Sequence, residues 1–345
     1  MLFTLAGVGV NSFMNCIKLQ ELITNACRDI VKRSDDLHVL AWSENCSNIE
    51  QFVRSNVWAG ARRDFLRSYA QGSITVHTCW TEVEDTHIRP WLGFDQLLAY
   101  TSQAPVIAEP ADHRGYYVCQ NLTQRRHRDY TIRSLINTGA GRLGRISYGY
   151  RQEPQPDNNG RGRPPPFPGI TEHCWPGGAE QFQLTNPVDI PPPPVNIWRS
   201  TAFNIITETH CDEPGSSFTE KTWQCVWLGR PFVIIGVPGV HQQLRDLGYQ
   251  LMLDFDYSWD DEPDWQKRIN RAATAVADYC RTYTPKEIVE INRAVVDHNR
   301  RRCRKMLLKR GLPSVIGDPN MEFTPGAAHL VEYLRSVMDA LRSEL

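Results

Sequence analysis

Residues 204–236 read NIITETHCDEPGSSFTEKTWQCVWLGRPFVIIG, and the pattern of this stretch decides the fold class. It opens with an apolar run that stops at the acidic residue Glu208. It closes with a second apolar run at residues 231–236, of the kind that forms a buried parallel strand. Gly229 stands just before that run, at the position where a helix is expected to end. The stretch therefore begins and ends as two strands of one sheet.

A helix is expected between these two strands. A polar loop with glycine and proline follows Glu208, and Ser216 or Ser217 can cap a helix over residues 218–228. Glu220 then lies in the first turn, where the helix dipole favours an anion. The order strand, loop, helix, strand is the βαβ unit of a doubly wound sheet.

In such sheets ligands bind beyond the carboxyl ends of the strands. Four polar residues of the stretch fall at this end, namely Glu208, Thr219, Glu220 and Lys221. The alternative for the glutamate–lysine pair is a solvated first helical turn without a ligand. The sequence predicts an α/β protein with a ligand site at these residues.

The same residues resemble a family signature. The order Glu, Thr-Glu-Lys and Gly-x-Pro-x-x-x-x-Gly is similar to the donor-binding signature of alpha-1,3-fucosyltransferases and related GT-B nucleotide-sugar glycosyltransferases. The resemblance implies that Glu220 binds the ribose hydroxyls and Lys221 the diphosphate of a donor such as GDP-fucose, with Thr219 beside them. The chemistry agrees, because a carboxylate accepts two hydroxyls and an ammonium at a helix N-terminus neutralises a pyrophosphate.

Two acidic residues are candidates for the chemical step. In the family pattern the residue at Glu208 contacts the donor sugar, so Glu208 is a candidate sugar ligand and a candidate catalytic residue. An inverting transfer also needs a carboxylate that deprotonates the acceptor hydroxyl, which the family takes from its N-terminal domain. The candidates in that region are Glu44, Glu82, Glu84 and Asp85. We predict Glu44, since it follows the end of a predicted strand.

Length and composition set the broad class. The 345 residues suit two domains, and 41% apolar residues supply their cores. A net charge of −1 provides no global basic field for nucleic acid, and no window reaches the roughly 18 apolar residues of a membrane span. The ten cysteines stand singly, without a Cys-x-x-Cys pair or zinc-like spacing, as in reduced cytoplasmic proteins. We therefore expect a cytoplasmic protein, in the host cytoplasm if the chain is viral.

The first 112 residues predict an α/β domain that binds the acceptor. Strands are expected at the N-terminus and at residues 37–42, 74–80 and 105–108, with helices at residues 15–32, 49–70 and 95–100. Gly7 and Gly9 follow the first strand, but no third glycine completes a dinucleotide fingerprint. We interpret them as a tight turn near the acceptor.

A second domain, the donor domain, is predicted over residues 113–275. It begins with a strand at residues 116–120, a helix at 125–137 and a strand at 145–148. The run Cys-x-Asn-x-x-x-Arg-x-His-Arg at residues 119–128 resembles the first strand–loop–helix of the donor domain in virus- and phage-encoded relatives of the family. The resemblance implies that an arginine here reaches the donor diphosphate. Arg125, Arg126 and Arg128 compete for this role, and Arg126 and Arg128 are the first choices, since they lie at the start of the helix, where a phosphate docks. The basic cluster could also contact RNA, but no aromatic platform accompanies it, so we expect no nucleic acid partner.

Residues 151–194 hold twelve of the 23 prolines, which predicts an extended excursion within the donor domain as a lid or packing loop. Beyond Gly236 we expect a helix at residues 240–247, a last strand at 249–255, and helices at 265–283, 285–309 and 325–343. Asp254 and Asp256 resemble the Asp-x-Asp metal site of GT-A glycosyltransferases. A metal-dependent transferase that uses these two residues is therefore an alternative.

Together these features predict two Rossmann-like domains of GT-B type, with C-terminal helices from residue 276 onward. The expected function is a metal-independent transfer of a sugar from a nucleoside-diphosphate sugar to a glycan or other hydroxyl acceptor. No cofactor is expected, and no oligomeric state follows from the sequence. The rival interpretations are a non-catalytic protein of GT-B shape and a hydrolase, although no Gly-x-Ser-x-Gly nucleophile elbow is present.

Overall fold

The computed structural model describes part of the chain. The described residues are 2–6, 37–41, 66, 69–71, 74–78, 88–90, 115–121, 125–148, 198–208, 211, 218–310 and 322–323, with single positions at 332, 335, 336, 339 and 342. The predicted helices at 15–32 and 95–100, the strand at 105–108 and the proline-rich segment 151–194 lie outside these residues. Within the described part the fold is α/β, with two parallel sheets and helices.

The first sheet has five parallel strands in the order β4-β3-β2-β1-β9. The strands are β1 (Leu2–Ala6), β2 (Leu37–Ala41), β3 (Ile74–Thr78), β4 (Ile88–Pro90) and β9 (Glu322–Phe323). The structure confirms the three predicted strands β1, β2 and β3. The strands β4 and β9 were not predicted, and they are only three and two residues long. Because β9 pairs with β1, the C-terminal part of the chain returns to the N-terminal sheet.

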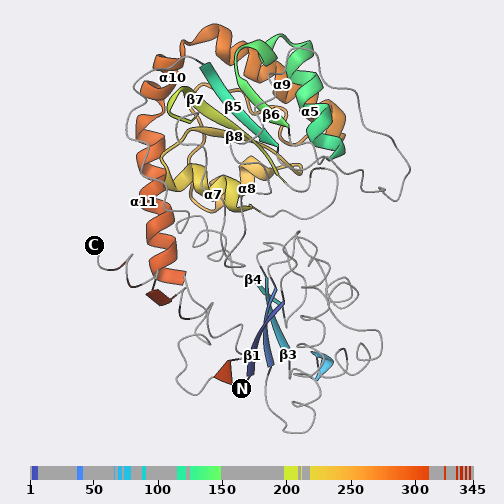
Figure 1. The fold of residues 1–345 in the computed structure, drawn as a ribbon, viewed down its shortest axis with the longest axis vertical. Helices are drawn as coiled ribbons and strands as arrows, with labels where there is room; N and C mark the ends of the chain where they lie inside the picture. The colour runs from blue at the N-terminus through green and yellow to red at the C-terminus, as the bar shows by residue number, and fades with distance from the viewer. Residues whose placement is uncertain are drawn as a thin grey trace.

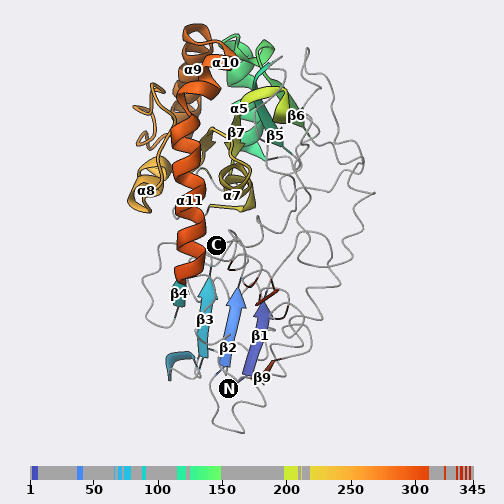
Figure 2. The same cartoon turned by 90° about the vertical axis from the view of Figure 1, so that its left-hand side faces the viewer.

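The second sheet has four parallel strands in the order β6-β5-β7-β8. They are β5 (Gly115–Asn121), β6 (Arg145–Tyr148), β7 (Thr201–Thr207) and β8 (Phe232–Ile235). All four agree with the predicted strands. Figures 1 and 2 show the two sheets in separate parts of the molecule.

The helices belong mainly to the second sheet. They are α5 (Arg126–Asn137), the short η1 (Ala140–Arg142), α7 (Glu220–Trp227), α8 (Val240–Asp246), α9 (Trp265–Thr282), α10 (Pro285–Ile291) and α11 (Arg293–Arg310). In Figure 2 the long helix α11 runs from the four-stranded sheet toward the five-stranded one. In the described part of the chain, no helix combines the length and the apolar character that crossing a membrane requires.

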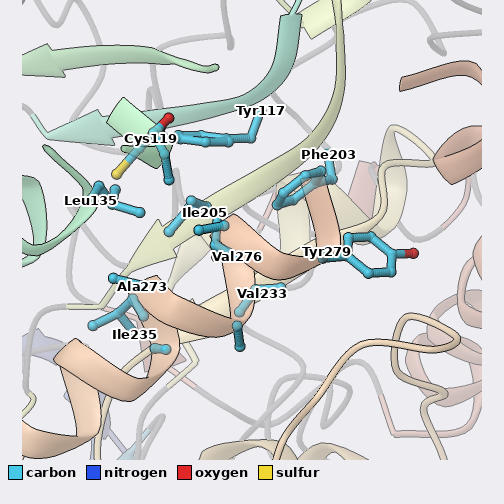
Figure 3. Packing of buried hydrophobic residues seen from close by; sticks show 14 of the residues in the cluster. Tyr117, Cys119, Leu135, Phe203, Ile205, Val233, Ile235, Ala273, Val276 and Tyr279 are labelled. Carbon is cyan, nitrogen blue, oxygen red and sulfur yellow. Dashed lines mark hydrogen bonds between the residues drawn. The ribbon is translucent and has the colours of Figure 1, made fainter. Parts of the chain in front are cut away.

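Alternate residues of the strands build two separate cores. Odd-numbered residues of β5, β7 and β8 pack with α5 and α9, as Figure 3 shows for Phe203 and Ile205 of β7 beside Tyr279 and Val276 of α9. Even-numbered residues such as Ile206 pack with α7, α8 and α11. This alternation is the period of a strand buried on both faces. It places α5 and α7 on opposite faces of the sheet.

The prediction of a strand at residues 249–255 is wrong. The segment pairs with no strand in the described part of the chain, and side chains bind two of its backbone amides instead. Asn299 accepts from the amide of Gln250 at 2.8 Å, and Asn292 accepts from that of Leu253 at 2.9 Å. An apolar sequence alone does not distinguish such a segment from a buried strand.

The single helix predicted at residues 285–309 is two helices that meet at Asn292. This residue is fully buried, and its amide nitrogen donates to the Ile288 carbonyl at 2.8 Å and to the Tyr279 hydroxyl at 3.1 Å. The start of α10 has a capping box, in which Thr284 and Glu287 exchange hydrogen bonds. The helix predicted at 325–343 is helical at its described positions 332, 335, 336, 339 and 342.

Candidate functional site

The four-stranded sheet has a switch point between β5 and β7. The chain leaves β5 through α5 toward β6 on one side, and leaves β7 through α7 toward β8 on the other side. The loops that follow β5 and β7 therefore diverge to opposite faces of the sheet. In open parallel sheets this divergence creates a crevice in which ligands bind.

Two cations from opposite faces converge at this point on one backbone oxygen. Lys221 on α7 donates from Nζ to the carbonyl oxygen of Thr207 at 3.4 Å. Arg128 on α5 donates from Nη2 to the same oxygen at 3.5 Å. Both distances are long for an N–H···O bond, whose optimum is about 2.9 Å. The structure thus brings together two of the residues that the sequence assigned to the donor diphosphate.

Glu208 directly follows β7, and its carboxylate is engaged on both oxygens. Oε1 accepts from the Thr219 amide at 3.1 Å and from the Thr222 hydroxyl at 2.6 Å, while Oε2 accepts from the Thr219 hydroxyl at 2.6 Å. Lys221 Nζ lies 3.9 Å from Oε2, and the Glu208 side chain is only 3% exposed. The carboxylate is therefore held by the start of α7 and is buried beneath it.

This arrangement corrects the predicted start of α7. Thr219 is the N-cap residue, rather than Ser216 or Ser217, and its side chain makes no capping bond within the helix. Its hydroxyl and its own backbone amide both donate to Glu208 instead. The carboxylate that follows β7 thus anchors the N-cap residue, and its negative charge also stabilises the helix N-terminus through the helix dipole.

The start of α5 is tied to the same point. His127 is buried, and its Nε2 donates to the carbonyl oxygen of Glu208 at 2.9 Å. Arg126, the first residue of the helix, is exposed, and its guanidinium lies 5.1 Å from the ring centre of Trp265. Of the two predicted diphosphate ligands on α5, Arg128 points to the end of β7, whereas Arg126 stacks on Trp265.

The end of β5 adds a polar pair. Thr207 donates from its hydroxyl to Oδ1 of Asn121 at 2.5 Å, and Nδ2 of Asn121 donates to the sulfur of Cys119 at 3.4 Å. Burial raises the pKa of the Cys119 thiol to about 12, so this cysteine stays a protonated, unreactive thiol at neutral pH. The pair joins the carboxyl ends of the two strands on either side of the switch point.

Arg268 on α9 binds several backbone carbonyls at the same edge of the sheet. It is buried, and its guanidinium donates to the carbonyls of Gly236 at 3.1 Å and of Pro263 at 3.5 Å, and also to those of Cys211 and Glu262. These acceptors come from segments after β7, after β8 and before α9. Its donors are occupied, so we assign Arg268 a structural role.

The alternative metal site lies elsewhere. Asp254 accepts a hydrogen bond from the hydroxyl of Tyr283, at 3.1 Å, and Tyr283 directly follows the C-terminal end of α9. The switch-point edge of the sheet is contacted from the other end of this helix, by Arg268 in its first turns. Asp256 instead accepts from the amide and hydroxyl of Ser258, at 2.8 and 3.1 Å. The described residues contain no group of three or more metal-ligating side chains close enough to share an ion. The two carboxylates thus have separate partners, and Asp254 lies toward the opposite end of α9 from the switch point.

Two predicted site residues cannot be placed by their side chains. Glu44 lies outside the described residues. Glu220 is the first residue of α7, and its side chain is not among those described. Conversely, sequence reasoning missed three residues that contact Thr207 or Glu208 at the switch point, namely His127, Thr222 and Asn121. Thr222 had a weak signal, since it follows the Thr-Glu-Lys motif directly, but its partner is 14 residues away in sequence.

Comparison with known proteins adds no family. No protein-family model matches the chain, and neither the curated proteins nor the solved structures contain a match to it.

Proposed function

We propose that this chain is a glycosyltransferase of GT-B type that binds the diphosphate of a nucleotide sugar at the β5–β7 switch point. The observation that carries the proposal is the convergence of Lys221 and Arg128 on the Thr207 carbonyl. A diphosphate would offer these two converging cations full negative charges and several acceptor oxygens.

The charges at the switch point also favour an anion. Of the three charged groups Arg128, Lys221 and Glu208, two are cationic, and the one anion already accepts three hydrogen bonds. The Lys221 side chain is 28% exposed, so its ammonium can reach a ligand. The N-terminus of α7 faces the same point, and its dipole adds to the attraction for phosphate.

The same groups would serve the chemical step. When the sugar leaves the nucleotide, negative charge develops on the departing diphosphate, and preorganised cations stabilise that charge. Lys221 and Arg128 are the cations that the protein supplies, so the proposed transfer is metal-independent. Glu220 is proposed to bind the ribose, and Glu44 to deprotonate the hydroxyl of a glycan or other acceptor.

The five-stranded sheet is proposed as the core of the acceptor domain. In Figure 2 the arrows of β1, β2 and β3 point toward the part of the molecule that holds the four-stranded sheet. Their carboxyl ends thus face the donor half, as a two-domain transferase with Rossmann-like halves requires for an acceptor beside the donor. We propose a cytoplasmic site of action, in the host cytoplasm for a virus-encoded protein.

Thermal melting with nucleoside diphosphates and nucleotide sugars, GDP-fucose included, tests the proposal. A bound ligand raises the melting temperature by mass action, and we expect one diphosphate to do so selectively, with or without EDTA. Lys221→Ala should lower the affinity for that diphosphate about 10- to 100-fold, since a hydrogen bond to a charged group contributes about 1.5 to 3 kcal/mol.

The matched control is Lys267→Ala, which removes an exposed lysine of α9 and should leave the affinity unchanged. A shift that disappears with EDTA would instead favour the metal-dependent alternative at Asp254 and Asp256. Equal binding by the wild type and Lys221→Ala would refute the proposed diphosphate site. Selective binding without sugar transfer to any acceptor would favour the non-catalytic alternative.

A further inference from the structure

We propose that Glu208 is a positioning residue, which holds Lys221 and the start of α7 at the switch point, and does not act as the base or as a sugar ligand. The inference rests on the proposed function for its ligand, a nucleoside diphosphate. It assigns to Glu208 a different role from the catalytic one that the sequence suggested.

The hydrogen bonds of the carboxylate support this role. A carboxylate has about four acceptor positions, and the donors of Thr219 and Thr222 already occupy three of them. Lys221 Nζ lies 3.9 Å from Oε2, within ion-pair distance. At most one acceptor position remains, and it is on a carboxylate that is already paired with a cation.

Burial supports the same conclusion. A general base must lie within hydrogen-bond reach of the proton that it removes, about 2.6 to 3.2 Å or one water away. The Glu208 side chain is 3% exposed, whereas its neighbour Lys221 is 28% exposed. Of this ion pair, the lysine is therefore the side chain that is open to solvent, and the carboxylate is not.

The backbone of Glu208 is fixed as firmly as its side chain. Its amide donates to the Ile235 carbonyl at 2.9 Å, and its carbonyl accepts from His127 at 2.9 Å. Glu208 thus joins β8, α5 and α7 at one point. Because the backbone is held in this way, the carboxylate has a fixed position beside the Lys221 ammonium and can orient it.

Glu208→Gln isolates the charge, because glutamine keeps the shape and can still accept from Thr222 and from the Thr219 amide. The substitution has two opposing effects on diphosphate affinity. It removes a negative charge near the ligand, which strengthens binding, and it releases Lys221, which weakens binding. A double-mutant cycle with Lys221→Ala separates the two effects, since only the second requires the lysine.

We expect the cycle, measured by titration calorimetry with the diphosphate that stabilises the wild type, to show a coupling of at least threefold. Glu208→Gln must weaken binding more, or strengthen it less, with Lys221 present than with alanine there. Coupling within error of zero, combined with lost turnover and unchanged diphosphate affinity, would overturn the proposal and restore the catalytic role.

Asp260→Asn is the matched control. Asp260 is also a buried carboxylate that holds a helix N-terminus at this edge, because it accepts from the amides of His241 and Gln242 at 3.0 and 3.3 Å. Its substitution should lower the melting temperature without any coupling to Lys221. Equal coupling for both carboxylates would mean that general loosening of the fold is being measured, which would overturn the proposal.

A second measurement needs no ligand. Acylation of Lys221 by an amine-reactive ester, followed by peptide mass spectrometry, reports how firmly the ammonium is held. We expect Glu208→Gln to speed acylation of Lys221 at least threefold and Asp260→Asn to leave it unchanged. If no diphosphate binds but this rate rises, the proposed function fails while the positioning contact stands. An unchanged rate would refute the positioning contact itself.

Discussion

The starts of α7 and α8 lie at the same edge of one sheet, and each is held by a buried carboxylate. The two regions differ in the partners of that carboxylate. At α7, Glu208 accepts from Thr219 and Thr222 and faces a partly exposed lysine. At α8, Asp260 accepts from two backbone amides and from Nδ1 of His241, at 2.6 Å.

The difference lies in what each carboxylate faces. His241 is fully buried, and its second ring nitrogen, Nε2, accepts from the Ile234 amide at 3.1 Å, on the outer edge of β8. Both ring nitrogens are therefore occupied by partners inside the protein. The α8 start is a closed structural network, whereas at the α7 start Lys221 is partly exposed and its hydrogen bond to Thr207 is long. A helix N-terminus becomes a candidate binding site when a cation beside it reaches solvent.

The largest predicted effect tests the closed region. His241→Ala removes the acceptor for the Ile234 amide and leaves Asp260 buried without its main partner. The variant loses a hydrogen bond to a charged group, which contributes about 1.5 to 3 kcal/mol, and leaves a buried amide unsatisfied at a cost of about 1 to 3 kcal/mol. Urea denaturation should therefore show a fall of roughly 3 to 5 kcal/mol in the free energy of unfolding. Diphosphate affinity of the folded variant should stay within twofold of the wild type. A stability loss below about 1 kcal/mol would show that the two regions do not differ as described.

A smaller effect is expected for one hydrogen bond of the α7 region. Thr222→Val keeps the shape of a fully buried side chain but removes its bond to Glu208. A hydrogen bond to a charged group contributes about 1.5 to 3 kcal/mol, so chemical denaturation should show a loss near the lower value, because Glu208 keeps two other donors. The control is Thr274→Val on α9, an exposed threonine whose hydroxyl donates only to the Asn270 carbonyl in the same helix. An equal loss in both variants would mean that the bond to Glu208 has no special weight.

The smallest effect is expected at Arg126. Because this side chain is exposed and stacks on Trp265, Arg126→Ala should change diphosphate affinity by less than about twofold, in line with the modest strength of an exposed cation–π contact. Calorimetric titration beside Lys221→Ala provides the comparison. A tenfold loss at Arg126 would place the anion on the outer side of α5 and would contradict a site at the Thr207 carbonyl.

The sequence predicted the elements of the four-stranded sheet well because their signals are local. Apolar runs of four to seven residues, separated by glycines at helix ends, gave β5, β6, β7 and β8. Gly139 and Gly229 adopt φ values of 81° and 70°, a backbone region that favours glycine, as expected of residues that end helices. These choices depend only on neighbours along the chain.

The errors arose where a distant side chain replaced a local partner. The amides of Gln250 and Leu253 bind two asparagines that lie 49 and 39 residues further along, so an apolar segment is not a strand. The N-cap residue of α7 is Thr219, which Glu208, 11 residues earlier, holds in place, rather than the serine that local preference indicated. Local propensity cannot reveal such contacts, because their partners meet only after the sheet has formed.

By itself, the sequence determined the α/β class, the strand–helix–strand unit around Glu208 and Lys221, and the end of the sheet at which a ligand is expected. Periodicity and turn residues encode these features, and both act over a few residues. Only the tertiary structure decided that Arg128 rather than Arg126 shares the Thr207 carbonyl with Lys221, and that the Glu208 carboxylate is engaged by α7. Those outcomes depend on which faces of the sheet α5 and α7 cover, and the packing of the two cores fixes the faces.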